Sequence, residues 1–121
     1  MLIRNIDEVS RKPVQMEGVK GVTMAVMVGR DDGAPNFALR SFRVEPGGHS
    51  PRHQHDYEHE VFVVEGTGEV LLEGSFHPIR KGDVIYVPAN HEHHFRAGAS
   101  GMQFLCLVPV TRNCGDPTPG S

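Results

Sequence analysis

The middle of the chain is a series of short apolar, β-branched runs that alternate with turns. Each run is about four to eight residues long and turn residues return about every eight to twelve positions, which is typical of a β-sandwich or barrel. No window has a helical period, apart from a short turn within 6–12. The predicted strands cover residues 22–28, 37–44, 60–64, 69–72, 84–87 and 102–108. Glycines between 60–64 and 69–72 predict a hairpin, and 97–101 predicts a further turn.

The length of the chain indicates one domain. It has 121 residues, and its 14 glycines and 9 prolines match the density of the predicted turns. We predict an all-β single domain with three parts: an N-terminal arm or edge strand over 1–20, a β-barrel over 21–109 and a flexible C-terminal tail over 110–121.

Charge and cysteine content argue against several classes of protein. The formal net charge is -3 and no cluster of Lys and Arg occurs, so nucleic acid is not an expected partner. Apolar runs are too short to span a membrane, and the first residues lack the pattern of a signal peptide. Cys106 lies in an apolar run and Cys114 in the tail, so two free thiols are expected. We therefore expect a cytoplasmic protein without nucleic-acid or membrane partners.

Histidine is the unusual residue type of this chain. There are 8 histidines, and all except His77 lie within 49–59 and 91–94. Neutral imidazoles gathered in this way indicate a site for a divalent transition metal. Side chains alternate along a strand, so His53 and His55 point to the same face and can reach one ion.

The next ligand on this segment has two alternatives. If extended geometry resumes after a bend at 56–57, His59 shares one face with Val61. Glu58 and Glu60 then point to the other face. His59 and the two glutamates are therefore mutually exclusive as ligands, and the spacing alone leaves both alternatives open.

These residues resemble the two sequence motifs of the cupin superfamily of small β-barrels. The matched positions of the first motif are Gly47, His53, His55 and Gly66, and those of the second are Gly82, Pro88 and His93. His59 stands where the family usually has Glu, Asn90 replaces a glycine, and Ala97 replaces an asparagine. Asn tolerates left-handed backbone geometry, so the exchange at Asn90 is mild. The resemblance spans roughly residues 37–108 and implies a double-stranded β-helix, or jelly-roll barrel, in a single domain.

The resemblance also implies a ligand set. It extends to a subgroup of small cupins with four-histidine sites, which implies one divalent metal ion per chain, with manganese expected. The implied ligands are His53, His55, His59 and His93. Imidazole as a ligand type also allows Fe, Ni, Zn and Cu. Four neutral ligands leave the ion its full charge, so it should favour an anionic ligand. The neighbouring histidines that we do not expect to bind are His49, His91 and His94.

Three further residues are candidates for lining a pocket. In the resembling subgroup, the face of the last strand that carries Phe104 and Cys106 looks into the barrel near the metal. Arg40, on the strand 37–44, is a candidate for binding a substrate carboxylate with two hydrogen bonds. Core packing is the alternative for Phe104 and Cys106, and a surface or interface position is the alternative for Arg40.

The whole set predicts a metal-dependent oxidoreductase, dioxygenase-like, that acts on a small anionic organic molecule. The alternatives are a metal-dependent isomerase, a non-catalytic ligand-binding or sensor protein, and a closed structural zinc site. Apolar residues on both faces of 61–64 predict a homodimer, because the face outside the barrel needs cover. Imidazole must be neutral to bind, so acid is expected to release the metal at about pH 5–6.

Overall fold

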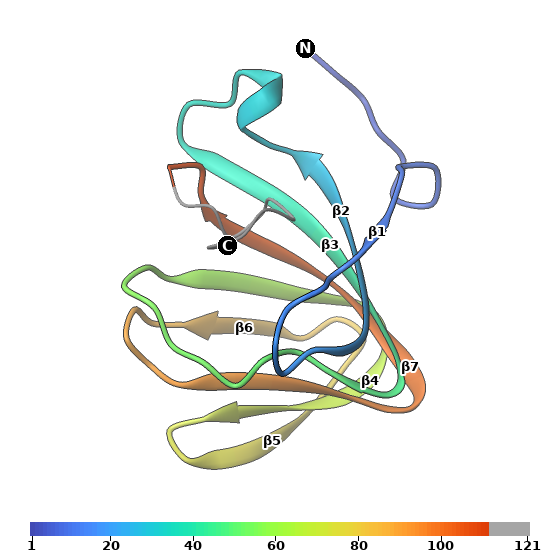
Figure 1. The fold of residues 1–121 in the computed structure, drawn as a ribbon, viewed down its shortest axis with the longest axis vertical. Helices are drawn as coiled ribbons and strands as arrows, with labels where there is room; N and C mark the ends of the chain where they lie inside the picture. Colours follow the sequence, from blue (N-terminus) through green and yellow to red (C-terminus); the bar gives the residue numbers. More distant parts are fainter. Residues whose placement is uncertain (112–121) are drawn as a thin grey trace.

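The protein is almost entirely β-sheet in the computed structural model, which describes residues 1–111 (Figure 1). The strands are β1 (Lys12–Pro13), β2 (Lys20–Val28), β3 (Phe37–His49), β4 (His59–Leu72), β5 (Ser75–Arg80), β6 (Val84–Val87) and β7 (His93–Pro109). One turn of 3-10 helix, η1 (Arg30–Asp32), joins β2 to β3. No helix among residues 1–111 is long and apolar enough to cross a membrane. Of the tail predicted over 110–121, the part from residue 112 onward lies outside the described residues, and Cys114 belongs to that part.

The strands form one antiparallel sheet that folds back on itself. Its order is β1-β2-β3-β7-β4-β5, and β6 pairs with the first part of β4. The second half of β7 pairs with β3, and its first residues pair with the end of β4. The long strands β3, β4 and β7 therefore take part in two layers, which meet on one side of the molecule and diverge toward the other (Figure 1). This arrangement confirms the predicted all-β jelly-roll barrel.

The hairpin predicted between 60–64 and 69–72 is wrong, because β4 runs unbroken through both segments. The glycines bend the strand and do not reverse it. Gly66 has a φ of 84°, and a Cβ there would meet the carbonyl oxygen of Gly101 in β7. Only glycine allows this contact, so β4 and β7 turn the corner of the barrel together.

Two further stretches differ from the sequence prediction. Residues 97–101, expected as a turn, lie inside β7, where Gly101 also has a positive φ of 79°. Strand β5 is not predicted, because only Ile79 of its 6 residues is buried and the strand carries no alternating pattern.

Valine fills much of the space between the two layers, as suits a strand-forming residue. The most deeply buried apolar side chains are Val61, Val63, Val70, Val87 and Val108. Three aromatic rings stack beside them, with the Phe104 centroid 5.3 Å from that of Phe42 and 4.9 Å from that of Phe95. Because His59 begins β4 and His93 begins β7, this core fixes where both histidines enter the barrel.

The N-terminal segment packs against the outer face of β2 and β3. Strand β1 pairs with β2, and Arg11 donates a hydrogen bond to Ser41 Oγ at 2.6 Å. Arg43 forms an ion pair with Asp7 at 2.8 Å. This part of the outer surface is therefore covered by the chain itself.

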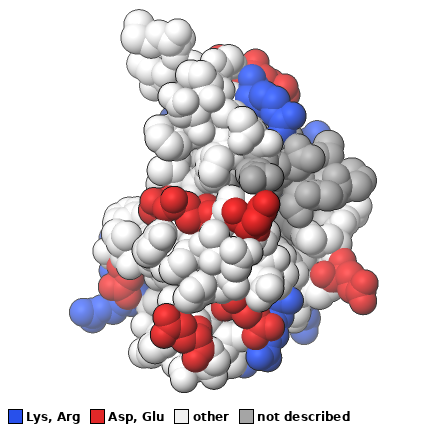
Figure 2. Space-filling view, turned by 90° about the vertical axis from the view of Figure 1, so that its left-hand side faces the viewer, with Lys and Arg blue, Asp and Glu red and all other residues white. Residues whose placement is uncertain are grey.

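Charged side chains are scattered over the surface. Figure 2 looks at the face that lies on the left in Figure 1, and its Lys, Arg, Asp and Glu residues form small separate groups. A surface that binds nucleic acid gathers Lys and Arg along one side. The face in Figure 2 has no broad basic area of that kind.

Candidate metal centre

The fold brings together four histidines from separate parts of the chain, which we call the four-histidine cluster: His53, His55, His59 and His93. The first two lie on the loop between β3 and β4, and the others are the first residues of β4 and β7. Two backbone hydrogen bonds tie this loop to β7. The N–H of His53 donates to the carbonyl of His93 at 3.1 Å, and the N–H of His93 donates back at 2.9 Å.

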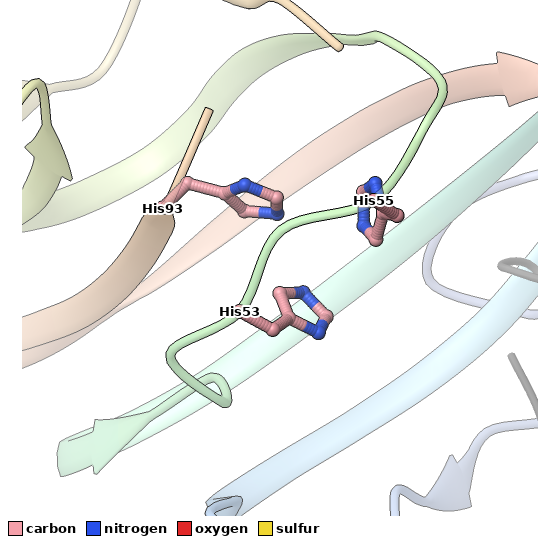
Figure 3. A group of neighbouring side chains, drawn as sticks. All are labelled: His53, His55 and His93. Carbon is pink, nitrogen blue, oxygen red and sulfur yellow. The ribbon is translucent and has the colours of Figure 1, made fainter. Parts of the chain in front are cut away.

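The rings of the cluster lie close to one another. Ring centroids are 4.7 Å apart for His53 and His93, and 4.8 Å apart for His53 and His55. The ring of His59 lies 4.5 Å from that of His55 and 5.0 Å from that of His93. One ligand nitrogen from each of His53, His55 and His93 lies within 4.8 Å of the others. Figure 3 shows these three rings around a common space.

Burial keeps the cluster neutral. Together with the neighbouring His93 and His55, which are smaller causes, it lowers the pKa of His53 to about 4. It also lowers the pKa of His59 to about 2, with the charge of Arg40 as the next cause. The pKa values of His55 and His93 are lowered as well, chiefly by burial. Neutral imidazole is the form that binds a metal, so every ring has a lone pair to offer at neutral pH.

Backbone carbonyls orient two of the rings. Nδ1 of His93 lies 2.9 Å from the carbonyl oxygen of His91, and Nδ1 of His55 lies 3.4 Å from that of Tyr57. A carbonyl oxygen only accepts, so each Nδ1 carries the hydrogen and donates it. Each Nε2 therefore keeps its lone pair, and metal-binding histidines commonly have such an outer acceptor.

Neither carbonyl is identified by the sequence analysis. Each lies two positions along the chain from the histidine that it orients, so the only available signal is a local turn. The ring of Tyr57 also stacks on that of His55, with 4.0 Å between centroids and 2° between planes. The sequence analysis does not predict this contact either.

The pocket candidates from the last strand and from β3 lie at different depths. Cys106 Sγ is 3.1 Å from His59 Nδ1, and Arg40 Nη2 donates to the same sulfur at 3.1 Å. Arg40 is 3% exposed, so it lies inside the barrel and not on the surface. Phe104 stacks on Phe95 with 4.9 Å between ring centroids, and the Phe95 ring in turn lies 6.5 Å from that of His93.

The glutamates that compete with His59 in the sequence have a different environment. Glu58 and Glu60 are exposed, whereas His59 is 5% exposed and contacts the other rings. Two more histidines, His49 and His94, pair with each other at 5.3 Å between centroids. The structure thus gathers the four predicted residues, and their assignment as ligands stays a prediction.

The cluster fits a divalent transition-metal ion. Two nitrogen ligands that lie about 2.1 Å from one ion, at a right angle, are about 3.0 Å apart. The Nε2 atoms of His55 and His59 are 2.9 Å apart. The donors are imidazoles, which suit ions such as Zn, Cu, Fe and Ni. None of the buried polar side chains in residues 1–111 is a carboxylate.

Comparison with known proteins gives one family and several relatives. Residues 40–108 match the model of the family described as "Cupin domain". The chain is 34% identical over 76 residues to 1-methylthio-D-xylulose 5-phosphate methylsulfurylase of Rhodospirillum rubrum. That match covers 62% of this chain and 49% of the relative, so the chain spans about half the length of that protein.

Two longer matches cover most of the barrel. The chain is 25% identical over 109 residues to L-ectoine synthase of Halomonas elongata, which covers 88% of this chain and 79% of that protein. The solved structure of the polyketide cyclase RemF from Streptomyces resistomycificus superposes with a TM-score of 0.85 at 31% identity. It covers 91% of this chain and 80% of its own.

Proposed function

The chain belongs to the cupin family, and we propose that it is an enzyme whose four-histidine cluster holds one divalent transition-metal ion and which acts on a small anionic organic molecule. One observation carries the proposal: neutral imidazoles, held neutral by burial, converge inside the barrel. The enzyme names of the similar proteins support a catalytic role for this chain.

We propose manganese as the native ion, because of the resemblance to cupins with four-histidine sites. Fe, Ni, Zn and Cu are the other ions that imidazole ligands accept. His55 and His93 would bind through Nε2, since their Nδ1 atoms donate to backbone carbonyls. When bound, the ion supplies a Lewis acid to a substrate oxygen, and a redox-active ion also supplies electrons for oxidation.

The charges around the cluster favour an anionic ligand. Neutral ligands leave the charge of the ion uncompensated, and Arg40 adds a buried guanidinium nearby. The field of Arg40 reaches the cluster, because it contributes to the lowered pKa values of His53, His55 and His59. A carboxylate or enolate is stabilised in such a field.

As the first reaction class, we propose a reaction that involves no net oxidation, such as a ring closure or an isomerisation. The names of the three similar proteins describe a methylsulfurylase, a synthase and a cyclase, and none of them denotes an oxygenase. Dioxygenation, expected from the sequence, is the second candidate. The buried polar side chains of residues 1–111 include no carboxylate, and dioxygenation does not need a side-chain base for proton abstraction.

The first experiment measures the metal content of protein purified from its own host without added metal. A stoichiometric transition metal supports the proposed site, whereas protein that neither contains nor takes up any metal contradicts it. Product formation and oxygen uptake are then followed with a panel of small carboxylates, diketones and phenols. Product without oxygen uptake supports the first reaction class, and substrate-dependent oxygen uptake supports dioxygenation.

We also propose that two copies associate through the outer face of β4, β6 and β7. Phe62, Val84 and Tyr86 are exposed there by 44%, 71% and 56%. Phe62 pairs with Val84 on one side and with Leu105 on the other, so the apolar patch is continuous across three strands. Neighbouring exposed apolar side chains indicate a protein contact, and a patch of one kind can meet its own copy across a two-fold axis.

A further inference from the structure

Nδ1 of His59 contacts a side chain, whereas Nδ1 of His55 and Nδ1 of His93 contact backbone carbonyls. We propose that Cys106 is a positioning residue whose sulfur accepts a hydrogen bond from Nδ1–H of His59 and so keeps Nε2 of His59 free and directed at the cluster. The inference rests on the proposed function, since it takes His59 to be part of the metal site.

The pairing of three strands holds Cys106 beside His59. Cys106 of β7 lies opposite Arg40 of β3 and, on its other side, opposite Val61 of β4. His59 precedes Val61 by two positions, so both side chains point to the same face of β4. The sulfur lies 3.1 Å from His59 Nδ1 and 3.1 Å from Arg40 Nη2, and Cys106 is 4% exposed. Strand register therefore determines this contact, and solvent has little access to it.

The proposed direction of the hydrogen bond is the one that leaves Nε2 of His59 able to bind an ion. The guanidinium of Arg40 has donors only, so it donates to Sγ, and the sulfur is already an acceptor. If Nδ1 of His59 also donates to Sγ, Nε2 keeps its lone pair, as in His55 and His93. The other tautomer would place a hydrogen on Nε2 of His59, 2.9 Å from Nε2 of His55. That hydrogen would be donated to the lone pair of His55 Nε2, so neither nitrogen could face an ion, and Nδ1 of His59 would accept from the S–H of Cys106 instead.

Cys106 also links the charge of Arg40 to the cluster. The guanidinium and the imidazole of His59 meet on the same sulfur atom. The sulfur therefore ties the position of the His59 ring to that of the Arg40 guanidinium. The acceptors of His55 and His93 are backbone carbonyls, which side-chain substitutions leave in place, whereas a substitution of Cys106 removes its acceptor directly.

The first test reads the tautomer of His59 in the metal-free full chain. Long-range proton–nitrogen NMR correlations of the histidine rings are recorded at neutral pH, and His59 is identified by its loss in His59→Gln. We expect a protonated Nδ1 and a bare Nε2 in the wild type, and a mixture of tautomers in Cys106→Ala. A protonated Nε2 in the wild type, or an unchanged pattern in Cys106→Ala, overturns the proposal.

The second test measures the affinity for Zn and Mn ions by calorimetric titration of the metal-free chain. Loss of an outer partner typically weakens metal binding about 10–100-fold, which we expect for Cys106→Ala. Cys106→Ser retains an acceptor and should bind more tightly than Cys106→Ala. The matched control is Val63→Ala, which removes buried atoms from the barrel core at a position opposite Phe104 and four residues from His59.

The outcomes separate this inference from the proposed function. Equal affinity in the wild type and Cys106→Ala contradicts the positioning role, and so does an equal loss in Val63→Ala. A wild-type chain that binds neither ion contradicts the proposed function, whereas the NMR pattern of His59 still decides what Cys106 does.

Discussion

The metal-free protein should lose stability steadily as the pH falls from 7 to 5. Histidines of the unfolded chain have a pKa of about 6.5 and take up protons in this range. In the folded barrel, the pKa of His53 is lowered to about 4 and that of His59 to about 2. The unfolded state then binds more protons than the folded state, so the free energy of unfolding falls with the pH. For each ring, the loss begins near the unfolded pKa and continues down to the folded pKa.

The expected loss follows from this difference. Between pH 7 and pH 5, protonation in the unfolded state costs about 1.8 kcal/mol for each histidine that stays neutral when folded. Two such rings give about 3.6 kcal/mol, and solvent screening of the half-buried His53 reduces this to about 2–3.5 kcal/mol. Both folded pKa values lie below this range, so the loss depends little on where they fall. Burial of His55 and His93 acts in the same direction.

The assay is urea unfolding at pH 7, 6 and 5 with a chelator present, followed by circular dichroism because the chain has no tryptophan. A variant that combines His53→Gln with His59→Gln should lose the part of the pH dependence that these two rings contribute, about 2–3.5 kcal/mol, and keep the part due to His55 and His93. His77→Gln changes an exposed histidine outside the cluster and should retain it. Equal stability at pH 7 and pH 5, or the same slope in the double variant, would refute the reasoning.

Three further changes test other parts of the structure. His59→Ala should weaken metal binding in calorimetric titrations far more than Glu60→Ala, and equal losses would contradict the four-histidine assignment. Gly66→Ala should lower the free energy of unfolding by about 2–5 kcal/mol, from left-handed strain and from the clash with β7. Gly33 also has a φ of 83°, but no atom lies within 4 Å of a Cβ built there. Gly33→Ala should therefore lower the free energy of unfolding by backbone strain alone, and an equal loss of stability at both sites would contradict the corner contact. Phe62→Glu should convert a dimer to a monomer in sedimentation experiments, whereas a monomeric wild type would exclude the proposed association.

Apolar, β-branched runs bounded by turn residues predict β2 and β6 well. The runs at 22–28 and 84–87 correspond to strands at Lys20–Val28 and Val84–Val87, so only the start of β2 differs, by two residues. The bends of β4 and β7 are not predictable in this way, because a glycine in a turn and a glycine at a barrel corner leave the same signal. Which of the two applies depends on a partner strand, as with Gly66 and Gly101.

In the candidate site, too, local sequence motifs predict some residues, whereas contacts between residues far apart in the chain are not predicted. The motif positions select His53, His55 and His93, and the resemblance to cupins with four-histidine sites adds His59, the fourth histidine that the barrel gathers. The contacts of Cys106 with Arg40 and His59 join residues 66 and 47 positions apart, so they follow from strand register and not from a local pattern. Ordinary histidine pKa values predict acid release of the proposed metal at about pH 5–6; because burial lowers the pKa values of the cluster, we now expect this release at lower pH.

The backbone pairing of His53 with His93 has a consequence for how the protein is made. Three members of the cluster emerge early from the ribosome, but the fourth begins the last strand. Closing the long loop between them has an entropic cost that only the assembled barrel offsets. A nascent chain therefore has no complete site with which to sequester a metal ion. The proposed ion would therefore be captured after folding, and it would stabilise the finished barrel by mass action without nucleating it.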